Sequence, residues 1–476
     1  MSFELLVVLA YLALTLGIGF VSSRRTKNDG AFQGKQMGMS AIVFAAAGEW
    51  LGGTATSGVS EYGFTFGLSG AWYTIANGLG VLFLAVFFCK LYRSLNMNTI
   101  PGIISKFFGK QARKVSCVLL VLVMLVVGLS QIIAAGKLGQ ALLGLDFHVT
   151  ATIFAAVFIV FTILGGMCSV AAANCMHLFV MYGGVILALL ICVTRMRGFS
   201  EFFAEARAVD PTLLSATSIG GTKISSWIIA SLLGACTAQA GIQPVLAAKD
   251  QRTAKHACFC TALVVAPFGL ITATLGIAAR IMSEQGTLLS STGELVTEAK
   301  LALPTLMLNL PPLAGGLVLA SILAAIMSTV SPIILSSGTM LAKDLYEPKH
   351  PEASPQTLLR VSRVMTALSG VICWLGAIAL VKQTMVLDVV YAAYSLRGAI
   401  FVVLLIGIVQ KKRSGKAACV SMILTGIVAV AWTVIQVVTG AYPIAPWFTE
   451  TYAAVCTAAV SMLVLSGLFR KQTELA

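Results

Sequence analysis

Charged residues are scarce in this chain of 476 residues. Only 11% of them are Asp, Glu, Lys or Arg, whereas about 25% would be usual in a soluble domain. Hydrophobic residues make up 58%, and the mean hydropathy is +0.93. The chain has no polar stretch long enough to form a catalytic or signalling module. These features exclude a soluble protein and weigh against a receptor, and they predict an all-α polytopic membrane protein within a lipid bilayer.

Patterns for metal binding and disulfides are also lacking. The eleven cysteines include no CxxC pair, and most lie inside apolar runs, where cysteine behaves as a small buried hydrophobe. The four histidines, His148, His177, His256 and His350, are scattered, and no Ser/His/Asp set or metal-ligand spacing includes them. The sequence therefore predicts that the protein is not an enzyme and has no resident cofactor or metal centre.

Thirteen segments are long and apolar enough to cross hydrocarbon, which takes about 20 residues. They are 3–22, 40–61, 70–94, 115–136, 148–166, 168–194, 224–246, 256–282, 312–341, 359–381, 385–409, 416–439 and 449–469. The first lacks a preceding basic stretch and a clear cleavage site, so we expect it to be retained as a membrane span.

The net charge of +14 is interpreted through this topology. In a soluble protein it would suggest nucleic acid, but most of the 32 Lys and Arg residues follow odd-numbered segments or lie in the C-terminal tail. Because cytoplasmic loops carry the excess of basic residues, we expect the N-terminus outside and the C-terminus in the cytoplasm. We predict a plasma-membrane location and no nucleic-acid partner.

An ionisable residue, Glu49, and several glycines interrupt the second segment, within the stretch Ala45–Trp72 that reads AAAGEWLGGTATSGVSEYGFTFGLSGAW. In hydrocarbon a glycine-interrupted helix persists where its freed carbonyls line a cavity or coordinate something. The pattern thus predicts a broken membrane helix with Glu49 near mid-depth. Glu49 has two interpretations: it binds substrate or ion, or it makes a structural hydrogen bond at the break.

The segment 385–409 carries Asp388, Tyr391, Tyr394, Ser395 and Arg397, mostly three or four positions apart, which places them on one helix face. Arg397 lies about midway along. A guanidinium at that depth can clamp a carboxylate with two hydrogen bonds. Alternatively, Arg397 forms a structural pair with Glu49 or with helix carbonyls, and both interpretations remain open.

Small residues dominate the segment 312–341, where Ala314–Gly338 reads AGGLVLASILAAIMSTVSPIILSSG. Close helix packing explains most of them. The adjacent hydroxyls of Ser328 and Thr329 suggest a second role, because hydroxyls and freed carbonyls can bind a hard monovalent cation. Periodicity alone does not decide between packing and an ion site.

Four motifs resemble the sodium:solute symporter family, which includes proline, pantothenate, sialic acid and sodium/glucose cotransporters. The strongest are AAIMSTVSPIILSSGTMLAKDLY (Ala324–Tyr346) and TIPGIISKFFGK (Thr99–Lys110). Weaker ones are GGM (Gly165–Met167) and QPVLAAKDQRTAKHA (Gln243–Ala257). They occur in the family's order, and the resemblance spans most of the chain.

The resemblance implies thirteen transmembrane helices with a core of the leucine-transporter type, built from two inverted repeats of five helices. On this basis we expect a threefold division of the chain. Residues 1–38 hold the first helix and a cytoplasmic loop, 39–410 the ten-helix transport core, and 411–476 two C-terminal helices with a short tail.

The resemblance also implies a sodium site. Its ligands would be the carbonyls of Ala47, Trp50 and Ala325 and the hydroxyls of Ser328 and Thr329. Two departures fall in the sixth segment, where Asn174 stands in place of a common Asp and His177 in place of a Gln. A second cation site is therefore not expected, and we predict one sodium ion per transport cycle. A third departure, Gly102 in place of a common Glu, has no functional interpretation.

We predict a sodium-coupled symporter that imports a small organic solute by alternating access. The candidate substrate-binding residues, one acid, one base, two amides and two aromatics, favour an amino-acid-like or carboxylate solute: Glu49, Trp50, Gln239, Gln243, Tyr394 and Arg397. The closest alternative is a proton-coupled carrier of the same fold that titrates Glu49. A passive channel or a receptor is a more distant alternative. We expect the protein to act as a monomer.

Overall fold

The computed structural model describes residues 3–23, 37–290, 293–381, 386–410 and 414–474. Regular structure in these residues is helical, apart from two isolated bridges that join Met37 to Ala248 and Leu289 to Leu295. The all-α architecture predicted from composition is therefore confirmed. The side chain of Asp388 lies outside the described residues.

The helices follow one another closely along the chain. They are α1 (Phe3–Ser23), α3 (Met39–Trp50), α4 (Val59–Phe66), α5 (Trp72–Phe83), α6 (Cys89–Ser94), α7 (Ile100–Leu143), α8 (Phe147–Arg195), α9 (Phe199–Val209), α10 (Gly221–Ala235), α11 (Gln239–Leu246), α12 (Gln251–Val265), α13 (Phe268–Glu284), α14 (Ala299–Leu308), α15 (Pro312–Met340), α16 (Pro355–Leu380), α17 (Val386–Val409), α18 (Gly415–Thr439) and α19 (Glu450–Glu474). Short π or 3-10 turns lie between them: η1 (Thr54–Gly58), η2 (Gly67–Ala71), η3 (Leu84–Phe88), η4 (Pro211–Leu214), η5 (Leu341–Tyr346) and η6 (Glu347–Lys349).

Nine helical stretches among the described residues are long and apolar enough to cross a membrane. The remaining predicted segments are also helical. The helices α1 and α17 have 21 and 24 residues, α3 ends at Trp50, and α8 contains two predicted segments. The structure therefore confirms a multi-helical membrane architecture, and the count of thirteen spans stays a prediction.

A sharp turn divides α8 into two arms. Gly166 has a φ of 56° and a ψ of −149°, a backbone conformation that side-chain-bearing residues rarely adopt. Both arms contact the end of α1 at Gly19. A Cβ there would meet the ring of Phe161 at 2.7 Å, and Ser169 Oγ donates to the Gly19 carbonyl at 3.2 Å. The chain therefore turns at Gly166, as expected between the fifth and sixth segments.

Two helices are interrupted halfway along their length, and they lie side by side. The first ends as α3 and resumes as η1 and α4, and the second ends as α10 and resumes as α11. Met37 N donates to Ala247 O at 2.8 Å, and Lys249 N donates to Met37 O at 3.2 Å, so the start of α3 is tied to the end of α11. The first interruption confirms the sequence prediction. The second was not predicted.

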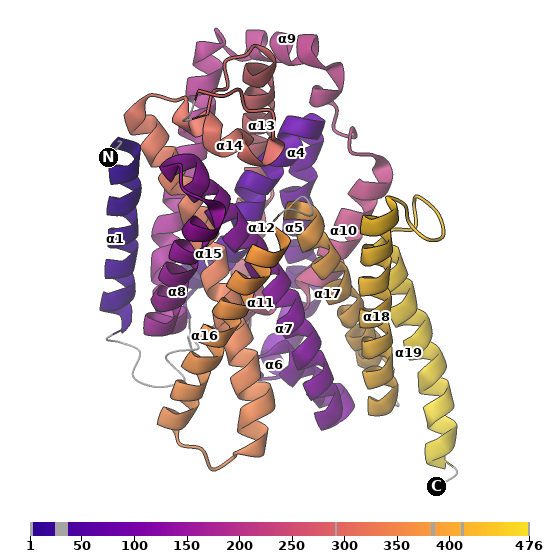
Figure 1. Cartoon of the computed structure of the whole chain (residues 1–476). Coiled ribbons are helices and arrows are strands. Elements are labelled where there is room, and N and C mark those ends of the chain that lie inside the picture. The colour runs from indigo at the N-terminus through magenta and orange to yellow at the C-terminus, as the bar shows by residue number, and fades with distance from the viewer. Residues whose placement is uncertain (1–2, 24–36, 291–292, 382–385, 411–413, 475–476) are drawn as a thin grey trace.

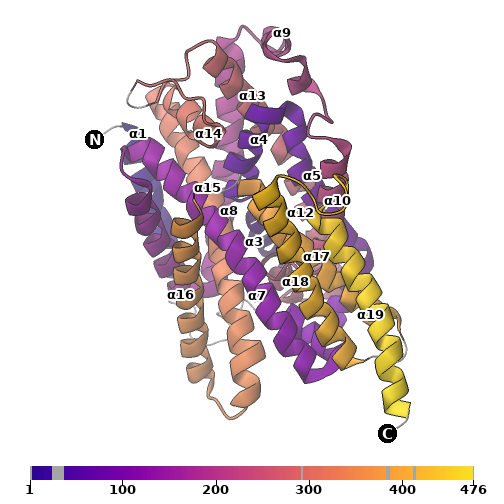
Figure 2. The same cartoon turned by 45° about the vertical axis from the view of Figure 1, so that its right-hand side comes forward.

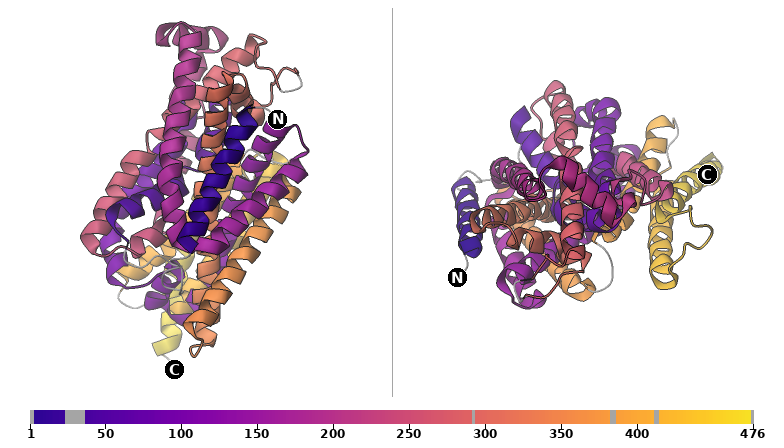
Figure 3. Two further views of the ribbon diagram at one scale, coloured as in Figure 1. Left: turned by 90° about the vertical axis from the view of Figure 1, so that its left-hand side faces the viewer. Right: turned by 90° about the horizontal axis from the view of Figure 1, so that it is seen from above.

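The helix α15 passes through the interior of the bundle, and nearly all of its residues are buried (Figure 2). The helices α18 and α19 pack beside α17 at the periphery, where they expose apolar side chains. The helix α9 crosses one end of the molecule (Figure 3). The helix α1 begins near that end, and α19 finishes at the opposite one (Figure 1). The candidate site lies where α15 passes the interruption of α3.

Candidate functional site

The interruption of α3 frees backbone groups that a continuous helix would pair. Side chains from two other helices bond to them. The N–H of Gly53 donates to Oε1 of Gln131 on α7 at 2.8 Å, and the carbonyls of Gly48 and Glu49 accept hydrogen bonds from α15. Buried backbone groups without partners cost several kcal/mol in hydrocarbon. These contacts therefore stabilise the broken conformation.

The hydroxyls of Ser328 and Thr329 face the end of α3. Ser328 Oγ lies 3.0 Å from the Gly48 carbonyl and 2.8 Å from the Ala325 carbonyl. Thr329 Oγ1 lies 2.6 Å from the Gly48 carbonyl and 3.1 Å from the Glu49 carbonyl. Each hydroxyl has one proton and two lone pairs, so it can donate to a carbonyl and still offer oxygen to a cation. The set resembles the all-oxygen surroundings that hard cations prefer.

The carbonyls predicted as sodium ligands lie at the same place. The carbonyl of Ala325 accepts from Ser328, and that of Ala47 accepts from the N–H at the C-terminal end of α3 at 2.9 Å. Trp50 is the last residue of this helix. The two hydroxyls contact the carbonyls of the residues between Ala47 and Trp50. The structure thus brings the predicted elements together, and the ligand set itself stays a prediction.

Glycine is required at the interruption because the neighbouring helices approach so closely. A Cβ at Gly52 would lie 2.3 Å from Thr329 Oγ1, and a Cβ at Gly48 would lie 2.2 Å from Nδ2 of Asn174. Both separations are far below van der Waals contact. The absence of side chains at these two positions therefore lets α15 and α8 reach the backbone of α3.

Asn174 connects α8 to both sides of this junction. Its Nδ2 donates to the carbonyls of Ser328 at 3.2 Å and of Ala45 at 3.4 Å. His177 lies one turn further along α8, where its Nδ1 shares a hydrogen bond with the hydroxyl of Tyr11 on α1. The two departures noted in the sequence therefore have structural partners, and Asn174 contributes donors at a place where a carboxylate would contribute acceptors.

A buried acid and a buried base lie close to the interruption. Glu49 is 3% exposed and Arg397 is 0% exposed, and their charges lie within electrostatic range of each other. Neither oxygen of the carboxylate and no nitrogen of the guanidinium has a hydrogen-bond partner among the described residues. The Arg397 Cζ lies 3.9 Å from the ring centre of Tyr394 and 5.2 Å from that of Trp50. Cation–π contact with these rings and the nearby charge of Glu49 both stabilise the guanidinium.

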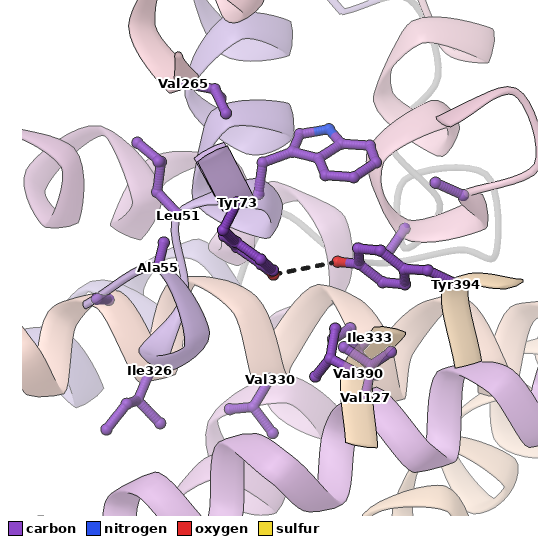
Figure 4. Packing of buried hydrophobic residues seen from close by; sticks show 14 of the residues in the cluster. Leu51, Ala55, Tyr73, Val127, Val265, Ile326, Val330, Ile333, Val390 and Tyr394 are labelled. Atoms are coloured by element: carbon purple, nitrogen blue, oxygen red, sulfur yellow. Dashed lines mark hydrogen bonds between the residues drawn. The ribbon is translucent and has the colours of Figure 1, made fainter. Parts of the chain in front are cut away.

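An aromatic group completes these surroundings, and two of its members, Tyr73 and Trp227, were not singled out from the sequence. The hydroxyl of Tyr73 lies 2.9 Å from Thr54 Oγ1 and 3.4 Å from the hydroxyl of Tyr394, toward which it points (Figure 4). Tyr391 stacks on Trp227 with ring centres 4.6 Å apart and an interplanar angle of 4°. In an apolar segment such rings look like lipid-facing residues. The polar face of 385–409 signalled Tyr391, but no comparable pattern surrounds Tyr73 or Trp227.

The two predicted glutamines lie on α11. Gln239 begins the helix, and its side chain bonds to the backbone at the start of α7: Oε1 accepts from Ile100 N at 2.8 Å, and Nε2 donates to Asn98 O at 3.1 Å. Gln243 accepts from Gln239, and its Nε2 has no partner in the portion of the chain that the structure describes. In this conformation Gln239 is a structural bridge, and Gln243 keeps a donor for a ligand.

Two of the motifs quoted above meet at the end of α15. Thr99 Oγ1 donates to Oδ1 of Asp344 at 3.0 Å, and Arg113 Nε donates to the same oxygen at 2.7 Å. Thr99 also caps α7, because its hydroxyl accepts from Gly102 N at 3.1 Å. The TIPG and DLY segments therefore form one buried network. This network joins the end of α15, the helix that carries Ser328, to the start of α7, to which Gln239 bonds.

The sequence was compared with known protein families and known proteins. Residues 32–426 match the model of the sodium:solute symporter family. The high-affinity proline transporter PutP of Bacillus subtilis is 24% identical over 455 residues, which cover 92% of this chain and 94% of that one. The sodium/glucose cotransporter of Vibrio parahaemolyticus is 23% identical over 452 residues, covering 88% and 83% respectively.

Solved structures share the fold. A Na⁺-coupled sialic acid symporter in a substrate-bound outward-open state aligns with a TM-score of 0.81 at 19% identity, covering 98% of both chains. A transporter of the nucleobase-cation-symport-1 family in a closed conformation aligns with a TM-score of 0.57 at 14% identity, covering 93% of this chain and 96% of that one. The family and these relatives are transporters, which confirms that the chain is not an enzyme. The chain belongs to the sodium:solute symporter family.

Proposed function

We propose that the protein is a sodium-coupled symporter that imports a small organic solute by alternating access across the plasma membrane. The observation that carries this proposal is the contact of the Ser328 and Thr329 hydroxyls with the carbonyls at the broken end of α3. An oxygen-lined junction between two helices can hold a cation without a fixed charge, and its occupancy then depends on how closely the helices approach.

The sodium ion is cargo in this account, and we place it between α3 and α15. Its proposed ligands are the carbonyls of Ala47, Trp50 and Ala325 and the hydroxyls of Ser328 and Thr329. Binding draws the two helices together and stabilises the outward-open form, and rocking of the core releases ion and solute inside. At a potential of about 100 mV and a tenfold gradient, one sodium ion supplies about 3.7 kcal/mol. That corresponds to accumulation of several hundred-fold.

The buried charges of Glu49 and Arg397 favour a charged solute. Glu49 and Arg397 are both buried, and neither has a hydrogen-bond partner among the described residues. A buried ion without hydrogen bonds is costly, so a ligand that supplies them binds favourably. A zwitterion offers an ammonium to Glu49 and a carboxylate to Arg397, and a simple carboxylate satisfies the second of these. We therefore propose an amino-acid-like or carboxylate solute held near Glu49, Trp50, Gln243, Tyr394 and Arg397.

The two interrupted helices support the proposed arrangement of helices. They fall in the second and the seventh predicted segments, five segments apart, as two inverted repeats of five helices would require. We propose thirteen spans, with the transport core at residues 39–410, preceded by the N-terminal segment at residues 1–38 and followed by the C-terminal segment at residues 411–476. The N-terminus lies outside, the C-terminus lies in the cytoplasm, and the protein acts as a monomer.

A proton-coupled carrier is the second candidate, and one observation favours it. The carboxylate of Glu49 is buried with no hydrogen-bond partner in the described chain, so both of its oxygens remain open to a proton or a ligand. In that case a proton on Glu49 would take the coupling role of the sodium ion. The two candidates differ in the ion whose gradient drives uptake.

The test uses the purified full-length protein in two steps. A thermal-shift screen of amino acids and small carboxylates, with and without sodium, identifies the solute, because a ligand of the folded form raises its melting temperature. Uptake of that solute into proteoliposomes is then measured at fixed pH with an inward gradient of sodium or of potassium. We expect uptake with sodium alone. Uptake driven by a pH gradient without sodium would support the proton-coupled carrier instead.

A further inference from the structure

A second set of buried polar atoms without partners lies next to the charged pair. Nδ2 of Asn77 and the hydroxyl of Tyr391 have no hydrogen bond of normal geometry within the described residues. Asn77 is 0% exposed and Tyr391 is 2% exposed. We propose that these two groups form a neutral subsite that binds an oxygen atom of the solute, at the end of the solute away from its charges. This inference rests on the function proposed above.

Three helices hold the neutral subsite rigidly. Ser231 on α10 donates from Oγ to Oδ1 of Asn77 on α5 at 3.0 Å, so this bond does not use the amide N–H groups of Asn77, and the Tyr73 hydroxyl lies beside the amide. Tyr391 on α17 is stacked on Trp227 and lies edge-on to Tyr73 with ring centres 5.5 Å apart. Ser231 also lies beside the Tyr391 hydroxyl. The amide and the phenol are therefore fixed by their neighbours before any ligand binds.

Two tyrosines connect the neutral subsite to the charged pair. The ring centre of Tyr391 lies 5.6 Å from that of Tyr394, whose ring in turn lies 3.9 Å from the Cζ of Arg397. The hydroxyl of Tyr394 also lies 3.4 Å from that of Tyr73 (Figure 4). One small solute could therefore contact Arg397 at one end and the neutral subsite at the other.

The chemistry of the subsite defines the solute. The amide of Asn77 offers N–H donors, and the Tyr391 hydroxyl can donate or accept. A hydroxyl, carbonyl or carboxamide oxygen on the solute satisfies both groups, whereas a hydrocarbon chain leaves them desolvated and unpaired. A site built to hydrogen-bond a polar group rejects the analogue that lacks it. The solute class is therefore an amino acid or carboxylate with a neutral oxygen-bearing substituent.

The experiment compares solutes of nearly equal shape that differ in that oxygen. Purified full-length protein in sodium is titrated with threonine or valine, asparagine or leucine, glutamine or methionine, and lactate or isobutyrate, and the thermal shift gives an apparent Kd for each. We expect the oxygen-bearing member of the preferred pair to bind at least about tenfold more tightly. The substitutions Asn77→Leu and Tyr391→Phe should erase this difference while the shift remains enlarged by sodium.

The controls separate failure of the subsite from failure of the proposed function. Tyr182→Phe removes a hydroxyl that donates to the Val264 carbonyl and does not bond to Asn77 or Tyr391, and it should leave the preference intact. Equal, sodium-enlarged binding of both members of every pair by the wild-type protein overturns the subsite alone, and this result does not depend on any variant folding. An unchanged preference in folded Asn77→Leu and Tyr391→Phe overturns it as well. The absence of a sodium-enlarged shift with every solute contradicts the proposed function and this inference together.

Discussion

At the scale of single residues, the site depends on close contacts that a different side chain would disrupt. The Thr329 hydroxyl reaches the α3 carbonyls only because Gly52 has no side chain, and the Arg397 guanidinium contacts aromatic rings and has no hydrogen bond among the described residues. Small changes at these positions therefore have large and specific consequences.

Replacing Gly52 with alanine tests the close approach of α15. The added Cβ would lie 2.3 Å from Thr329 Oγ1, so either α3 or α15 must move. We expect a loss of about 1–3 kcal/mol in stability and the loss of sodium-dependent uptake. Melting temperature and proteoliposome uptake measure the two effects. Gly183→Ala on α8 is the matched control, because its Cβ would meet no atom within 4 Å, and it should behave as the wild type.

Replacing Arg397 tests the charged pair. Arg397→Ala removes the proposed carboxylate clamp and leaves Glu49 buried without a positive neighbour, so uptake should fall by at least about a hundredfold. Arg397→Lys keeps the charge without the planar fork and should recover only some of the activity. Arg280→Ala is the control, since Arg280 pairs with Glu284 at a partly exposed position. Full transport by Arg397→Ala would rule out the clamp.

At the scale of elements, the sequence predicted the interruption of α3 but not that of α10 and α11. The difference has a physical cause. The first break contains Glu49 and adjacent glycines, whereas the second contains Cys236, Thr237 and Ala238, which an apolar helix accommodates easily. Similarly, an amide in a membrane segment predicts a pocket residue at Gln239. In the structure its side chain bonds to the backbone at Asn98 and Ile100, far away in the sequence, and to the side chain of Gln243.

The network of Thr99, Arg113 and Asp344 at the end of α15 should contribute to stability. Thr99→Val removes the cap of α7 and one hydrogen bond to Asp344, and Asp344→Ala leaves Arg113 without its carboxylate. We expect Thr99→Val to lower stability by about 1–2 kcal/mol, and Asp344→Ala to lower it more because Asp344 is buried. Melting temperatures in detergent measure both. If Asp344→Ala were no less stable than Thr99→Val, the network would contribute less than its geometry indicates.

At the scale of the whole molecule, hydrophobic runs predicted the helices well, because a span of hydrocarbon demands length and apolar character and little else. They did not predict which helices face one another. The central place of α15 and the meeting of Tyr73 with Tyr394 are properties of tertiary packing that leave no local pattern in the chain. Sequence motifs indicated the family, whereas the contacts between distant residues became visible only in the structure.

The orientation of the molecule is open to a direct test. Glu352 lies in the segment between α15 and α16, and Glu294 lies in the segment between α13 and α14. In intact cells, a membrane-impermeant thiol reagent should label Glu294→Cys and spare Glu352→Cys. Permeabilised cells should show labelling at both positions. The reverse pattern in intact cells would place the N-terminus in the cytoplasm.

The central claim is that the hydroxyls of Ser328 and Thr329 bind the sodium ion that drives transport. Its most direct test is the accumulation of the identified solute in proteoliposomes under a sodium gradient, compared between the wild type, the double variant Ser328→Ala/Thr329→Ala, and the hydroxyl-retaining variant Thr329→Ser. We predict that the double variant, folded as judged by its melting curve, loses sodium-driven accumulation, whereas Thr329→Ser keeps most of it. Accumulation by the double variant at the wild-type level and with the same sodium dependence would contradict the account.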